Sequence, residues 1–333
     1  MRRAKASYEL SDRAHAIAFG GVGAAHAVAI RSGLVEAIDR KVHVLKVHRP
    51  YHESDHVLNF AYNALCGGRT LDDIELRRND EAFLNALGVE AIPDPTTAGD
   101  FCRRFGPAEI DALQAAINDA RLKAWARQGP EFTAVTARID ADGSILASNG
   151  KCKEGMALSY KGDWGYHSLL VSLANTAEPL FIVNRGGNRP SGEGAAAYLD
   201  KAISLCRRGG FRDILLRGDT DFSQTSHLDR WNAEGVCFVF GYDARKNLKA
   251  RADALESKRY RELVRRAKTA FPSGASRARQ PRVKAGIVRE RGYRNVRLRS
   301  EDVSEFDYSP TACAEMYRVV VLRKNLTAQR QLH

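Results

Sequence analysis

The first 129 residues carry hydrophobic positions at helical spacing. Apolar residues recur every three or four positions in short stretches that glycines and prolines separate. This pattern predicts helices over residues 14–38, 56–64, 70–76, 80–87, 98–105 and 107–127. Ser54 is the expected N-cap of the second helix. The last helix is expected to bury one apolar side, formed by Ile110, Leu113, Ile117 and Leu122.

After residues 129–130, Gly-Pro, the pattern changes to alternating or continuous apolar runs. These runs predict strands over residues 132–139, 166–174, 180–183, 214–216 and 236–240. Helical spacing returns over residues 194–208 and 223–233. Strands that alternate with helices in this way indicate a mixed α/β unit, and a further strand is expected over residues 317–324.

The chain is therefore expected to have three parts. Residues 1–129 form a helical module, residues 130–243 a mixed α/β core, and residues 244–333 a basic region that ends in a strand. With 333 residues, 44% of them hydrophobic, the composition is that of a globular protein and not of a disordered one. The sequence shows neither a signal-peptide pattern nor an apolar stretch of membrane-spanning length, which predicts a cytoplasmic protein without a membrane partner.

The positive charge is concentrated in one region. The formal net charge is +12, but residues 245–299 alone contain 19 Lys or Arg and 4 Asp or Glu, so the other residues together carry −3. With Tyr260 and Tyr293 among the arginines, the region suits phosphate contacts and base stacking, which predicts DNA binding over a merely solvated basic face. The candidate DNA-binding residues are Arg265, Arg266, Arg277, Arg279, Arg282 and Lys284.

Two groups of acidic residues lie where core strands are expected to end. Asp140 and Asp142 are two positions apart, so they project from the same face of a strand that is expected to end at Gly143. Asp219 follows the 214–216 strand and precedes a helix expected to be capped by Asp221 or Ser223. If the two strands are neighbours, Asp142 and Asp219 meet at one edge of the sheet.

Carboxylates gathered in this way repel one another unless a cation neutralises them. Their hard oxygen atoms favour Mg²⁺ or Mn²⁺, and two such ions can support an in-line phosphoryl displacement. The alternative is that these aspartates are only turn and cap residues.

The ordered motifs of the chain resemble a known family. These motifs are Ile139-Asp140-Ala141-Asp142-Gly143-Ser144, Tyr160-Lys161-Gly162, Gly165-Tyr166-His167-Ser168-Leu169-Leu170, Arg185-Gly186-Gly187-Asn188 and Arg217-Gly218-Asp219-Thr220-Asp221-Phe222. Together with Pro95-Thr96-Thr97 in the N-terminal part, they resemble bacterial insertion-sequence transposases of the DDE type, in particular the IS1380-like group.

The resemblance implies an RNase H-like fold, a mixed sheet flanked by helices with a basic, β-containing insertion after the fifth core strand. It also implies a transposase that cuts and rejoins DNA ends with two metal ions and whose N-terminal helical module, residues 1–129, binds DNA. The first catalytic aspartate then falls on Asp142, with Asp140 as the alternative, and the second on Asp219. Mg²⁺ or Mn²⁺ would be held by Asp142, Asp219 and Asp140. The implied partner is the terminal inverted repeats of the transposon, with a homodimer as one possible assembly.

The third acid of the family is a glutamate on a helix beyond the strand that residues 317–322 resemble. The four glutamates near this strand all precede it, namely Glu290, Glu301, Glu305 and Glu315. The resemblance therefore implies that the chain is C-terminally truncated. One alternative function is a non-catalytic remnant that still binds DNA, and another is a helical binding protein with an incidental α/β domain. His167 is expected to be a half-buried structural residue, and Trp164 and Trp231 are expected to lie in the core and not to stack on bases.

Overall fold

The computed structural model describes residues 19–149, 153–263 and 296–328, and these residues form two compact units with a border between Arg217 and Gly218. The helices of the first unit are α1 (Val22–Arg31), α2 (Leu34–Lys41), α3 (Glu53–Leu65), η1 (Asp72–Ile74), α4 (Glu75–Arg78), α5 (Glu81–Leu87), α6 (Pro95–Cys102), α7 (Pro107–Ala126), α8 (Pro130–Thr133) and α9 (Ala195–Arg208). Its strands are β1 (Ala137–Ala147), β2 (Ala157–Leu158), β3 (Trp164–Leu173), β4 (Glu178–Val183) and β5 (Ile214–Gly218).

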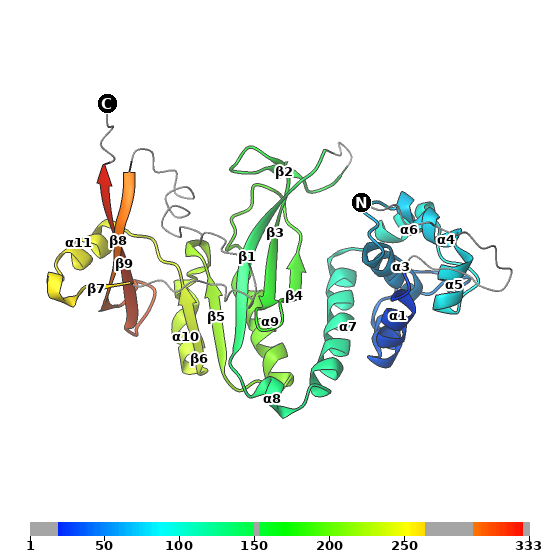
Figure 1. Ribbon diagram of the computed structural model, residues 1–333, viewed down its shortest axis with the longest axis horizontal. Coiled ribbons are helices and arrows are strands. Elements are labelled where there is room, and N and C mark those ends of the chain that lie inside the picture. The colour runs from blue at the N-terminus through cyan, green and yellow to red at the C-terminus, as the bar shows by residue number, and fades with distance from the viewer. Residues whose placement is uncertain (1–18, 150–152, 264–295, 329–333) are drawn as a thin grey trace, which may run out of the picture. The chain divides into compact units, whose positions relative to one another are not determined.

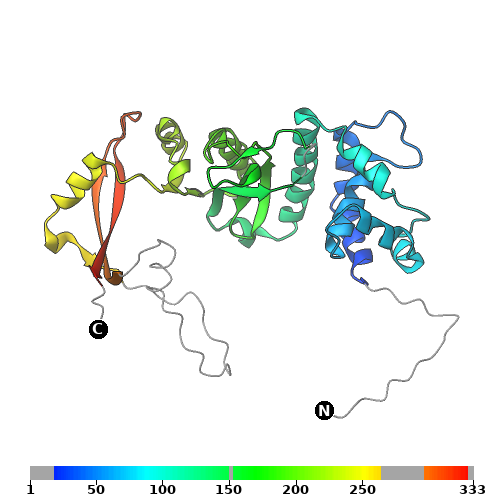
Figure 2. The same ribbon diagram turned by 90° about the horizontal axis from the view of Figure 1, so that it is seen from above.

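The helices before residue 103 gather beside α7, as the blue and cyan ribbons of Figure 2 show. Their shared core includes the fully buried Ile74 and Phe83 and the nearly buried Leu58 and Tyr62. The single helix expected over residues 14–38 is two helices within the described part, because Gly33 adopts a left-handed φ of 73° between α1 and α2. The other expected helices of this segment are present with shifted ends.

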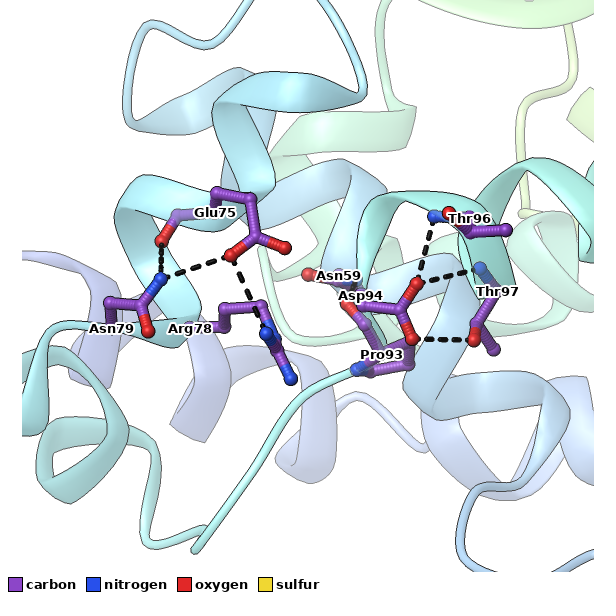
Figure 3. Close-up of polar contacts among 8 residues, drawn as sticks. All are labelled: Asn59, Glu75, Arg78, Asn79, Pro93, Asp94, Thr96 and Thr97. Atoms are coloured by element: carbon purple, nitrogen blue, oxygen red, sulfur yellow. Dashed lines mark hydrogen bonds and ion pairs between the residues drawn. The ribbon is translucent and has the colours of Figure 1, made fainter.

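Side-chain caps fix where these helices begin. Asp94 caps α6, since its Oδ1 accepts the N–H groups of Thr96 and Thr97 at 2.8 and 3.0 Å (Figure 3). The Thr97 hydroxyl donates to Oδ2 at 2.7 Å, and these bonds lower the pKa of Asp94. The preceding Pro93 carbonyl accepts the amide of Asn59 at 2.9 Å, which ties the cap to α3. A cap of this kind stabilises a helix by about 1 kcal/mol.

Helix α3 begins differently from the sequence expectation. Ser54 is its second residue and not its N-cap, and both its N–H and its hydroxyl donate to Asp39 at 2.9 Å. The N-cap is His52, whose N–H donates to Asp55 Oδ2 at 2.8 Å. The sequence pattern could not distinguish a serine that caps its own helix from one that contacts the preceding helix.

His56 is buried inside this helical core. Its ring stacks on Phe101 with a centroid distance of 4.3 Å, and its Nδ1 has no hydrogen-bond partner among the described residues. Burial lowers the pKa of His56, and the nearby carboxylates of Asp55 and Glu53 offset this shift only in part. The folded state therefore holds His56 as a neutral imidazole.

We expect the stability of the helical segment to decrease as the pH falls below about 6.5, the ordinary pKa of histidine. Below this value the unfolded chain takes up a proton that folded His56 resists, so protonation favours unfolding. His56→Phe should reduce the difference between melting temperatures measured at pH 7.5 and pH 5.0 by circular dichroism. His43→Phe, at an exposed site, should leave that difference unchanged. Equal pH dependence in wild type and His56→Phe would contradict this interpretation.

The sheet of the first unit is mixed. Its strand order is β2-β3-β1-β5, and β4 also pairs with β3. Strands β1 and β3 are antiparallel, as are β3 and β4, whereas β1 and β5 are parallel. Helix α9 packs against β1, β3 and β4, and α7 runs alongside β4 (Figure 1). The mixed α/β class expected from the sequence is thus confirmed.

Helix α7 satisfies the polar groups of strand β4 with its side chains. Ile182 N donates to Gln114 Oε1 at 2.8 Å, and Arg121 Nε donates to Glu178 Oε2 at 2.9 Å. One turn further along the helix, Trp125 Nε1 donates to the same carboxylate at 3.3 Å. Because β4 would otherwise present unpaired backbone groups, this stripe of side chains covers the edge of the sheet.

The prediction that α7 buries its apolar side is therefore wrong in part. Ile110 and Ile117 are 45% and 36% exposed, whereas Ala116, Asn118 and Ala120 are buried. The helix buries small residues that allow close approach and polar residues that bond to β4. A pattern of hydrophobicity alone misses this kind of face.

The strand expected over residues 132–139 is also shifted. Pro130 occupies the first turn of the short helix α8, and β1 begins only at Ala137. Strand β1 then continues through Gly143 to Ala147, so Gly143 does not end it.

The second unit is built from short helices and from strands. Its helices are η2 (Thr220–Phe222), η3 (Thr225–His227), α10 (Leu228–Ala233), α11 (Lys246–Asp253) and η4 (Ser257–Arg259), and its strands are β6 (Val236–Phe240), β7 (Arg261–Glu262), β8 (Val296–Tyr308) and β9 (Tyr317–Ala328). The strand expected over residues 317–324 is present as β9, and it belongs to a separate antiparallel sheet in the order β7-β8-β9. No helix among the described residues is long and apolar enough to cross a membrane.

Candidate active site

The parallel pair of β1 and β5 organises the first acidic group. The register runs from Ala137 opposite Ile214 to Asp140 opposite Arg217. Along β1, Ile139 and Ala141 are buried beneath the sheet's helical cover, so Asp140 and Asp142 project from the other face. The expectation that the two aspartates share a face is confirmed.

Asp140 forms an ion pair with Arg217, which the sequence pattern does not indicate. Arg217 Nε and Nη2 donate to the two carboxylate oxygens of Asp140 at 2.6 and 2.7 Å. This bidentate hydrogen bonding raises the pKa of Arg217. Both oxygens of Asp140 are thus occupied, and the role of Asp140 as a metal ligand remains a prediction.

Asp142 is exposed and has a less occupied carboxylate. Its Oδ1 accepts the N–H of Gly143 at 2.8 Å. Gly143 itself points to the buried face, where a Cβ would lie 2.5 Å from His167 Nε2 and 3.1 Å from Ser191 Cβ. Only glycine fits there, which explains why a glycine follows Asp142 inside a continuous strand.

His167 is a structural residue, as expected. It is 3% exposed, and its Nδ1 lies 2.8 Å from the Arg189 carbonyl oxygen. Trp164, by contrast, is 50% exposed, so the expectation that it lies in the core is wrong. Trp231 is fully buried, in agreement with the sequence.

Asp219 lies in the second unit, where it caps a tight turn. Its Oδ1 accepts the N–H of Asp221 at 3.0 Å and so begins η2. The helix expected over residues 223–233 begins only at Leu228 with His227 as its N-cap, so the expectation that Asp221 or Ser223 caps it is wrong. Gly241 packs against this turn so closely that a Cβ would lie 2.7 Å from Thr220 N. Asp219 is exposed and held in place by short backbone contacts.

The family comparison covers the elements that carry both aspartates. The model of the family described as "Transposase DDE domain group 1" matches residues 18–329. The chain belongs to this transposase family. Among curated proteins, no match to this chain is found. A solved structure titled "Cryo-EM structure of piggyBac transposase synaptic complex with hairpin DNA (SNHP)" is similar to it with 11% identity and a TM-score of 0.35. That similarity covers 88% of this chain and 60% of the piggyBac chain.

DDE transposase domains generally use divalent metal ions, and the two aspartates of this chain fit such ions chemically. Each uses Oδ1 to accept one backbone N–H, and the described residues offer no hydrogen-bond donor to either Oδ2. Exposed carboxylate oxygens of this kind are the ligands that Mg²⁺ and Mn²⁺ prefer.

The six candidate DNA-binding residues lie outside the described residues, namely Arg265, Arg266, Arg277, Arg279, Arg282 and Lys284. Tyr260, which is expected to stack on bases, lies within the described residues, and both its ring and its hydroxyl contact other residues of the chain. The Arg323 guanidinium lies 3.8 Å from its ring centroid, and its hydroxyl donates to the Ala252 carbonyl at 2.8 Å. Within the described part of the basic region, this tyrosine thus packs internally.

Proposed function

We propose that the chain is a transposase that cleaves DNA ends and joins them to target DNA by divalent-metal phosphoryl transfer. Membership of the DDE transposase family, over residues 18–329, is the observation that carries this proposal. Asp142 and Asp219 are proposed as its catalytic, metal-binding carboxylates. We also propose that the chain belongs to the IS1380-like group, that its DNA partner is the terminal inverted repeats of the transposon, and that it assembles as a homodimer.

The register of the sheet supports this pair of aspartates. The parallel pairing of β1 and β5 ends with Asp140 opposite Arg217. Asp142 lies two residues after Asp140, and Asp219 lies two residues after Arg217. The two aspartates are therefore equally far along the chain from the last paired residues of β1 and β5. The strand order and directions of the first unit also agree with the proposed RNase H-like core.

The residues around the aspartates have defined roles in this proposal. The N–H groups of Gly143 and Asp221 orient the carboxylates of Asp142 and Asp219, leaving Oδ2 of each for a cation. Arg217 neutralises Asp140, so Asp142 is preferred as the ligand. Bound Mg²⁺ or Mn²⁺ would activate the attacking oxygen and stabilise the leaving oxygen. The attacking group is water in cleavage and a DNA 3′-hydroxyl in joining, without a covalent protein intermediate.

A nicking assay on the purified chain tests the proposal. Supercoiled plasmid that carries the flanking terminal repeats is incubated with protein and Mg²⁺ or Mn²⁺, and EDTA serves as the control. We expect nicking that requires the metal. Salt-dependent DNA binding without any nicking would favour the non-catalytic remnant, and neither binding nor nicking would favour the unrelated helical binding protein.

A further inference from the structure

A group of metal-ligating side chains lies in the first unit, away from the aspartates of the proposed function. His48, His52 and Glu53 each offer one ligand atom, and these atoms all lie within 4.8 Å of one another. They come from the segment between α2 and α3 and from the first residues of α3. We call this group the His-His-Glu cluster.

Glu53 is the anchor of the His-His-Glu cluster. The residue is 1% exposed, and its Oε1 accepts the N–H groups of Val44 and Leu45, both at 3.1 Å. These two bonds fix the carboxylate and leave Oε2 directed at His48 Nδ1, 3.2 Å away. A buried carboxylate is costly unless a positive charge or hydrogen bonds compensate it. Hydrogen bonds that orient a ligand from behind are also typical of protein metal sites.

The separation of His48 and Glu53 suits a tetrahedral transition-metal ion, and all three ligand atoms lie within 4.8 Å of one another. Two ligand atoms about 2.0–2.1 Å from a zinc ion at the tetrahedral angle lie about 3.3 Å from each other. The separation of His48 Nδ1 and Glu53 Oε2, 3.2 Å, is close to this value. The ring of His52 stacks on that of His48 with centroids 5.5 Å apart and planes 14° apart, which brings the third donor to the same place.

The donor chemistry selects the class of ion. Two imidazole nitrogens and one carboxylate oxygen suit Zn²⁺ and its neighbours in the transition series, whereas Mg²⁺ prefers oxygen atoms alone. His48 and His52 are exposed, so an ion can reach the cluster from solvent and keep a water as its fourth ligand.

We propose that His48, His52 and Glu53 bind a zinc-class divalent ion that fastens the segment between α2 and α3 to the start of α3. The ion holds the peptide around Val44 and Leu45 against α3 through Glu53. The ion stabilises this segment and is separate from the proposed DNA-cleavage chemistry. Because the ion binds the folded segment, its binding raises the stability of that segment.

Calorimetric titration of the full chain with Zn²⁺ tests the proposal. We expect saturable binding and a higher melting temperature with Zn²⁺ than with the same concentration of Mg²⁺. Co²⁺ should give the intense visible absorption of a tetrahedral site. His52→Ala, at an exposed position, should weaken Zn²⁺ binding by at least about 10-fold, since even the loss of a residue that only orients a ligand costs about that much.

His43 provides the matched control, because it is an exposed histidine in the same segment and lies outside the cluster. His43→Ala should bind Zn²⁺ like the wild type. Circular dichroism confirms that each variant is folded. The proposal is overturned if the wild type takes up no Zn²⁺ at 100-fold excess, or if His43→Ala loses as much affinity as His52→Ala.

Discussion

Asp219→Asn and Asp142→Asn should each lower the rate of metal-dependent DNA-end cleavage by at least about 10²-fold. Each substitution keeps the size of the side chain and its backbone hydrogen bond, but it removes the negative charge that a divalent ion requires. Both side chains are exposed, so the folded structure should persist. Single-turnover cleavage of a labelled DNA end, followed on a denaturing gel, measures the rate.

Two matched aspartates serve as controls for these variants. Asp163 is exposed in the turn before β3, and Asp163→Asn should cleave at the wild-type rate. Asp140→Asn separates the two candidate ligands on β1. Because Arg217 already occupies both oxygens of Asp140, this variant should lose much less activity than Asp142→Asn. An unchanged rate in Asp219→Asn, or equal losses at positions 140 and 142, would refute the assignment.

Trp125→Ala should lower the free energy of unfolding by about 3–5 kcal/mol. Trp125 is 3% exposed, and its ring meets those of Phe132 and Phe211 with centroids 6.0 and 5.5 Å apart. Its Nε1 also donates to Glu178 on β4. The substitution therefore leaves a large cavity where α7 contacts the sheet. Urea unfolding followed by far-ultraviolet circular dichroism measures the loss.

Trp164→Ala is the control for this measurement. Trp164 is 50% exposed on β3, so its removal should cost less than about 1 kcal/mol. The chemical change is the same in both variants, and only the burial differs. Similar losses in the two variants would show that the packing around Trp125 contributes little.

The sequence predicted most elements because their signals are local. The strands over residues 166–174, 180–183, 214–216 and 236–240 and the helix over residues 194–208 all lie close to their observed places. The first core strand was misplaced at both ends for physical reasons. Pro130 starts a helical turn before it, and Gly143, which is typical of a turn, is needed inside the strand by the buried His167 and Ser191.

Contacts between distant residues could not be predicted in the same way. The pairing of Asp140 with Arg217 depends on the register of two parallel strands, which no local pattern encodes. The polar face of α7 depends on the edge strand β4 that it covers. His48, His52 and Glu53 precede the helix expected over residues 56–64, and their His-x-x-x-His-Glu spacing is a local signal in the sequence for a metal site.

Helix α7 contacts both the N-terminal helices and the sheet. Ala116 packs in one core cluster with Ala37 and Ile38 of α2. Further along α7, Arg121 and Trp125 donate hydrogen bonds to Glu178 on β4. Lys41 of α2 also reaches Asp119 on α7 at 2.7 Å. A rotation of these helices relative to the sheet that carries Asp142 would consequently have to break the contacts of α7 with α2 or with β4.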